Sequence, residues 1–155
     1  MRLDHVLTVA GLAGSVSANF HVGKADKTQI HVNPDKPGTP GLKFTTYIAC
    51  PSNYLNCNCY GGFSDNSDRG VGVAHGAITG DFSLKAGLCG MGQLDFYWRA
   101  AQGKWEFYVN GGNGDKQGEC FKNSADLAGC GLNPLSVLET NYDDKIVCYS
   151  YICGT

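Results

Sequence analysis

Hydrophobic and polar side chains alternate along most of this chain, which is the pattern of β-strands with one buried face. Glycine, proline and asparagine interrupt the alternating segments at short intervals and favour turns between them. The pattern predicts about seven to nine short strands and almost no helix. The segments that carry the alternation are 20–22, 30–32, 42–50, 71–73, 82–84, 94–99, 105–109 and 145–153.

Three stretches between these segments carry expectations of their own. Residues 20–22 and 30–32 flank a polar stretch, so two short strands around a turn are expected there. Residues 33–41 hold three prolines and two glycines, which predicts an exposed loop. Residues 121–139 contain the one predicted helical turn, which Asn123 or Ser124 would cap.

The clearest prediction is a hairpin whose two strands meet at the loop 100–103. If Trp98 and Trp105 point into the core, Tyr97 and Tyr108 point outward, because neighbouring side chains of a strand alternate. Exposed tyrosines can stack on a sugar ring or on a partner surface, so Tyr97 and Tyr108 are the predicted binding residues. The alternative is that all four rings serve core packing alone.

The polar residues of the same hairpin predict ion pairs on its outer face. We expect Asp95 or Arg99 to pair with Glu106 or Lys104, with the register left open. Together with the strand count, the hairpin favours an all-β domain, or a β domain with one short helix. The expected architecture is an antiparallel β-sandwich or a small barrel.

The first 18 residues have the order of a secretory signal peptide. Arg2 is followed by an apolar run from Val6 to Val16, and Ala18 fits the small-residue cleavage pattern. The run is too short to span a membrane, which takes about 20 residues. We therefore expect a signal peptide over 1–18 and a single domain over 19–155. The alternative is a first strand or helix of the mature fold.

Charge gives no indication of a nucleic-acid or membrane partner. The chain carries 12 Lys and Arg against 14 Asp and Glu, a net charge of −2. Removing residues 1–18 takes away one basic and one acidic residue and leaves the net charge unchanged. A basic excess that would hold phosphates is missing, and so is a basic amphipathic helix.

All eight cysteines lie beyond residue 49, and an even count behind a signal peptide indicates four disulfides in an extracellular protein. In an extended segment Cys57 and Cys59 point the same way, so each is expected to bond a different strand. A zinc or redox site would normally show Cys-x-x-Cys pairs, and none is present. The predicted disulfide residues are Cys50, Cys57, Cys59, Cys89, Cys120, Cys130, Cys148 and Cys153.

No known catalytic motif occurs in the sequence. A small secreted nuclease needs a base, an acid and a cation that converge, and His75, Glu106 and Arg99 are the candidate trio. The acidic, glycine-rich segments 65–68 and 110–119 are an alternative calcium site, although Asp, Asn and Gly are also ordinary turn residues. We expect no metal and no cofactor.

Three stretches, SVSANFHVG, YIACPSNYLNCNCYGG and VCYSYICGT, resemble small secreted cysteine-rich proteins of filamentous fungi. The resemblance covers the whole chain as a type. It implies an effector, toxin or wall-associated protein, many of which lack enzymatic activity, and it supplies no catalytic residues.

These features lead to one functional expectation with two alternatives. The first is a secreted, disulfide-stabilised, effector-like binding protein that acts on a host or cell-wall target without catalysis. The alternatives are a glycan-binding module of the cell wall and a small secreted hydrolase such as a ribonuclease. The expected partner is an extracellular protein or a cell-wall glycan.

Overall fold

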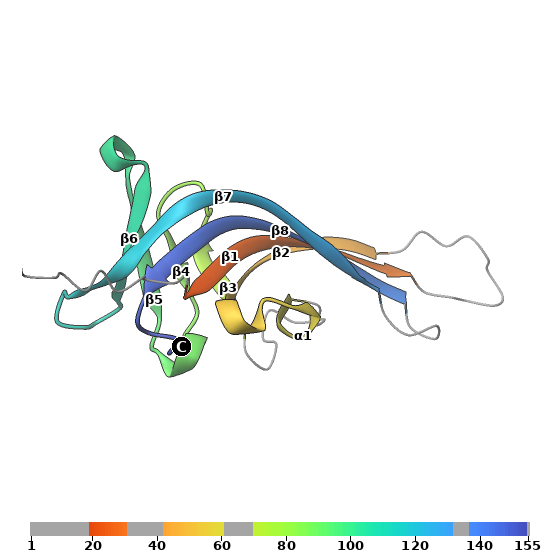
Figure 1. Ribbon diagram of the computed structural model, residues 1–155, viewed down its shortest axis with the longest axis horizontal. Helices are drawn as coiled ribbons and strands as arrows, with labels where there is room; N and C mark the ends of the chain where they lie inside the picture. Colours follow the sequence, from red (N-terminus) through yellow and green to blue (C-terminus); the bar gives the residue numbers. More distant parts are fainter. Residues whose placement is uncertain (1–18, 31–41, 61–69, 132–136, 155) are drawn as a thin grey trace, which may run out of the picture.

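Eight antiparallel strands form a closed barrel in the computed structural model, which describes residues 19–30, 42–60, 70–131 and 137–154 (Figure 1). Each strand pairs with the next along the chain, and β8 pairs back with β1. The all-β prediction is confirmed, and of its two architectures the barrel is the observed one. The strands are β1 (Phe20–Ile30), β2 (Leu42–Pro51), β3 (Val71–Gly76), β4 (Phe82–Leu84), β5 (Leu94–Arg99), β6 (Lys104–Val109), β7 (Lys116–Gly131) and β8 (Val137–Ser150).

The described helical segments are all short. The one α-helix among the described residues is α1 (Cys57–Tyr60), which comes shortly after β2. Three 3-10 turns accompany it: η1 (Ser52–Tyr54), η2 (Leu88–Gly90) and η3 (Ala100–Gln102). The last of these is the predicted loop of the hairpin β5–β6.

The strand predicted over 42–50 is confirmed almost to the residue as β2, whereas β1 and β8 are longer than the alternation predicts and β7 forms where no strand was predicted. Figure 1 shows β2, β1, β8 and β7 as long, curved strands that continue together beyond the barrel. The expectation of two short strands around a turn near residues 20–30 is wrong, because β1 runs unbroken through this polar stretch. Backbone pairing with β2 on one side and β8 on the other holds it extended.

The predicted helical turn in 121–139 is also wrong. Residues 116–131 form β7, which pairs with β6 and β8. Asn123 caps no helix; its Nδ2 donates to Oδ2 of Asp144 on β8 at 2.6 Å. Long-range pairing therefore overrides the local turn and capping signals. Residues 132–136 and the predicted loop 33–41 lie outside the described residues.

The barrel interior is filled with side chains. The rings of Phe82 and Phe96 stack at 4.4 Å between centroids, and those of Phe96 and Phe107 at 5.0 Å. The ring of Phe20 contacts that of Phe107 edge-on, with 5.4 Å between centroids. Trp105 packs in the same core and is 1% exposed. A barrel of eight strands has an interior just wide enough for such packing.

One extra residue in β8 creates a second core on the outside of the long strands. Asp144 pairs with Gly23 and Ile146 with Val22, so Lys145 is a bulge residue. Because of this bulge, Ile146 points into the barrel while Tyr142 points to the opposite face. The outer cluster lies under α1 and contains Ala25, Ile48, Cys50, Cys59, Tyr60, Cys130 and Tyr142.

The four predicted disulfides form, and two of them bind α1 to the long strands. Cys57 and Cys59 lie in α1 and are helical, so the expectation of an extended segment is wrong. Each nevertheless bonds a different strand, as expected, since the turn of α1 separates their directions. The pairs are Cys50–Cys59, Cys57–Cys130, Cys89–Cys153 and Cys120–Cys148.

Candidate functional site

The outer face of the hairpin β5–β6 presents two tyrosines side by side. Tyr97 and Tyr108 lie with ring centroids 5.8 Å apart and an interplanar angle of 62°. Tyr97 is 42% exposed. Trp105 points into the barrel and Trp98 packs against the core, so the two faces are arranged as the alternation predicts.

A polar cluster borders the tyrosines on one side. Asp95 accepts hydrogen bonds from Ser83 Oγ at 2.7 Å, Asn110 Nδ2 at 2.7 Å and Gln93 Nε2 at 3.2 Å. Burial raises the pKa of Asp95, but the three donors outweigh it and lower the pKa below its usual value. Asp95 therefore stays ionised and fixes the turn after β6 through Asn110.

An ion-pair network borders the tyrosines on the other side. Arg99 Nε donates to Glu106 at 2.7 Å, which confirms one of the pairings expected for this hairpin. The guanidinium also lies over the ring of Tyr97, 6.0 Å from its centroid. The hydrogen bond from Arg99 lowers the pKa of Glu106, and those from Lys104 and Lys116 lower the pKa of Glu119. Charged groups thus hold this face in one arrangement.

Two shallow, adjoining hollows follow the tyrosine pair. One has a volume of about 430 Å³ and extends from His75 past Asp95 to Tyr97. The other has a volume of about 630 Å³ and extends from Tyr97 past Tyr108 to the glycines of the turn after β6. Asp95, Tyr97 and Asn110 line both. Alternation already places Asp95 on the outer face, two residues before Tyr97, but it was predicted only as an ion-pair partner. Asn110 was not predicted, because only the turn after β6 brings it to Asp95.

The candidate catalytic trio is distributed over this face. His75 lines the first hollow and Arg99 the second, while Glu106 lines neither and is held by Arg99. The three residues do not share one hollow in this structure. A base, an acid and a cation must reach the same reacting atoms, and that convergence is not seen here.

Of the two segments considered as an alternative calcium site, the structure describes one. Residues 65–68 lie outside the described residues. In the turn before β7, Asn113 Nδ2 donates to Asp115 at 2.5 Å and Asn113 Oδ1 accepts from the Asp115 backbone, an ordinary turn arrangement. Within the described ranges, no group of three or more His, Cys, Asp or Glu side chains is placed to hold a metal ion.

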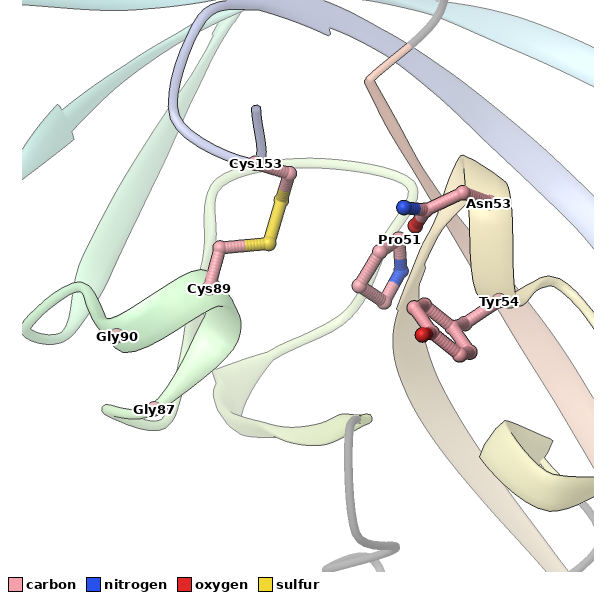
Figure 2. Close-up of a pocket in the computed structure, with 7 residues that line it drawn as sticks. All are labelled: Pro51, Asn53, Tyr54, Gly87, Cys89, Gly90 and Cys153. Carbon is pink, nitrogen blue, oxygen red and sulfur yellow. A yellow bond between two sulfur atoms is a disulfide. The ribbon is translucent and has the colours of Figure 1, made fainter. Parts of the chain in front are cut away.

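A third hollow of about 310 Å³ lies beside the disulfide Cys89–Cys153. Figure 2 shows the disulfide on one side and Pro51, Asn53 and Tyr54 across from it on the other. It has no charged side chain in its lining. The aromatic ring and amide of η1 make it a weaker candidate than the tyrosine face, which combines rings, amides and charges.

The fold and these sites define a disulfide-rich, closed antiparallel barrel with an aromatic outer face. No match to the chain is found among protein-family models, curated proteins or solved structures. In the described part of the chain, none of the helices has the length and apolar character needed to cross a membrane.

Proposed function

We propose that this protein is a secreted, effector-like binding protein that recognises a saccharide of an extracellular target on its Tyr97/Tyr108 face, without catalysis. The observation that carries the proposal is the pair of adjacent tyrosines on a rigid hairpin, bordered by side chains with amide and carboxylate groups. Four disulfides support the extracellular setting, since such bonds persist in oxidising compartments.

The chemistry of the face suits a sugar. Aromatic rings pack against the apolar C–H faces of a pyranose, while Asn110, Gln93 and Asp95 offer amide donors and carboxylate acceptors to its hydroxyls. The ion pairs and hydrogen bonds around the tyrosines fix these groups before binding. A fixed site loses little conformational entropy when the ligand arrives.

The geometry of the rings also favours one form of saccharide. Tyr97 and Tyr108 meet at 62°, so they form a corner and not a flat platform. A corner contacts one sugar ring from two sides, whereas a crystalline polysaccharide surface requires coplanar rings. The preferred ligand is therefore a soluble oligosaccharide or the end of a chain.

The test is retention of the oxidised protein on insoluble chitin, β-glucan and plant cell-wall material, with soluble oligosaccharides as competitors. The double variant Tyr97→Ala/Tyr108→Ala should lose retention. The matched control is Phe121→Ala/Tyr149→Ala, which removes another edge-to-face aromatic pair, with centroids 6.0 Å apart, from the strands β7 and β8. Equal melting temperatures of the two variants would show that both are folded.

Loss of retention only in the tyrosine variant would support the proposal. Retention that survives in that variant would remove the site from Tyr97 and Tyr108. If no matrix retains the wild type and no oligosaccharide binds, the saccharide proposal is wrong. The remaining target would be an extracellular protein.

A further inference from the structure

A separate pocket of about 250 Å³ lies where the long strands leave the barrel. Its floor consists of Ile78, Trp105 and Ile146, which are 7%, 1% and 1% exposed. Most of the pocket surface is apolar. The mouth of a β-barrel is a common place for a small-molecule site. None of its lining residues belongs to the Tyr97/Tyr108 face.

The floor is rigid. Trp105 Nε1 donates to the carbonyl oxygen of Gly80 at 2.7 Å, and the backbone N–H of Trp98 donates to Asp81 at 2.6 Å. These bonds bind the turn between β3 and β4 to the hairpin and leave the indole ring as a fixed apolar surface. Below it, the rings of Phe20 and Phe107 fill the barrel. A ligand therefore stops at Trp105, and a long alkyl chain has no room.

Three lysines form the rim. Lys24 donates to Asp26 at 2.6 Å, and Lys145 forms an ion pair with Asp143. Lys122 instead lies over the ring of Trp98, with Nζ 5.0 Å from the centroid. Among the described residues, no ion pair joins Lys122 to a carboxylate. The rim therefore carries about one positive charge that its neighbours leave uncompensated.

Uncharged polar groups complete the rim. Tyr47 is 37% exposed, and Thr79 lies on the turn beside it in the pocket lining. Their hydroxyls can donate to an acceptor next to Lys122. The carboxylate of Asp144 is 2% exposed and does not line the pocket, but it accepts a hydrogen bond at 2.6 Å from Asn123, which does.

We propose that this pocket binds a small amphipathic carboxylate, with an aromatic or short aliphatic body on Trp105 and the carboxylate at Lys122. One uncompensated ammonium matches a single negative charge better than the double charge of a phosphate. The filled interior restricts the ligand to a short molecule. Lys122 would leave the face of Trp98 or bridge it to the ligand, since a charge-assisted hydrogen bond is stronger than an exposed cation–π contact.

The experiment titrates the oxidised protein with 4-phenylbutyrate while two-dimensional NMR follows the indole N–H of Trp105. The neutral comparison ligand is 4-phenylbutan-1-ol, which has the same body and no charge. We expect a saturable shift with the carboxylate and at least tenfold weaker binding of the alcohol. Lys122→Gln should weaken carboxylate binding about tenfold, the effect of roughly 1.4 kcal/mol. Lys122→Arg should preserve it.

The matched control is Lys43→Gln, which removes an exposed lysine of β2 that does not line the pocket. Three results would overturn the proposal: no saturable shift up to about 1 mM, equal binding of the alcohol, or unchanged affinity in Lys122→Gln. Affinity that rises steadily with alkyl chain length would also overturn it, because it would require a hollow interior. Saccharide binding by the variant Tyr97→Ala/Tyr108→Ala tests the other site. Its loss would not change the result expected for carboxylate binding in the pocket.

Discussion

The phenol ring of Tyr142 lies directly against the backbone of Gly23 across the β1–β8 pair. A Cβ atom at position 23 would come within 2.5 Å of Tyr142 Oη and 2.6 Å of the Asp143 carbonyl oxygen. The other side of the ring is covered by Tyr60 of α1, stacked at 4.5 Å. Burial raises the pKa of Tyr142 well above its usual range. Glycine at position 23 therefore makes the second core possible.

Replacing Gly23 by alanine should displace Tyr142 and destabilise the fold by about 1–3 kcal/mol, the usual cost of overpacking. Urea unfolding at neutral pH measures the change. The matched control is Gly92→Ala, where the new methyl group would meet Val109 Cγ1 at an ordinary 3.6 Å. Equal unfolding midpoints for the two variants would contradict the close approach at Gly23.

The disulfides Cys57–Cys130 and Cys50–Cys59 should differ in their effect on the denatured chain. They join residues 73 and 9 positions apart. Replacing the first pair by alanine should cost about 4 kcal/mol by loop entropy and should raise the urea m-value, because the unfolded chain expands. Replacing the second pair should leave the m-value nearly unchanged. The prediction fails if both variants have the m-value of the wild type.

The carboxylate of Asp95 should make the stability of the tyrosine face depend on pH. Its folded pKa lies below the unfolded value, about 3.9. Its contribution is therefore fully present above that value and is lost as the pH falls through the folded pKa. Asp95→Asn should cost about 1 kcal/mol at pH 7, because the face is partly exposed.

Urea unfolding of the wild type and Asp95→Asn at pH 7 and about pH 2 measures this difference. The gap between the two proteins should close in acid, where the wild-type carboxyl is protonated. Ser83→Ala removes one of the donors to Asp95, so it should raise the folded pKa of Asp95. The stabilising contribution of Asp95 should then be lost at a higher pH than in the wild type. A gap that persists unchanged in acid would show that the Asp95 charge contributes nothing.

The hairpin β5–β6 was predictable because its alternation is local. Leu94 and Phe96 fall on the buried face, Tyr97 falls on the exposed one, and the register brings Trp98 opposite Trp105. The same reasoning indicates an outward-facing pair at Tyr97 and Tyr108. It also places Asp95 on this face, two residues before Tyr97. It does not indicate Asn110, whose contact with Asp95 depends on the turn after β6.

Errors in the prediction occur where distant segments decide local structure. The polar residues of β1 and the Asn-Ser pair at 123–124 favour turns by themselves, yet both segments are held extended by partner strands. The α1 helix is only four residues long, and two disulfides hold it against β2 and β7. A helix of four residues is not stable by itself, so no local sequence pattern predicts it.

Alternation and composition are local properties, and they were enough to predict an all-β fold, an even set of disulfide cysteines and the two aromatic faces of one hairpin. Closure of the sheet, the pairing of the cysteines and the bulge at Lys145, which turns Ile146 and Tyr142 to opposite sides, became visible only in the folded chain. The same holds for the lysine-rimmed pocket, whose lining comes from six separate segments. The physical reason is that closure, bulges and pocket walls depend on pairing between residues far apart in the chain.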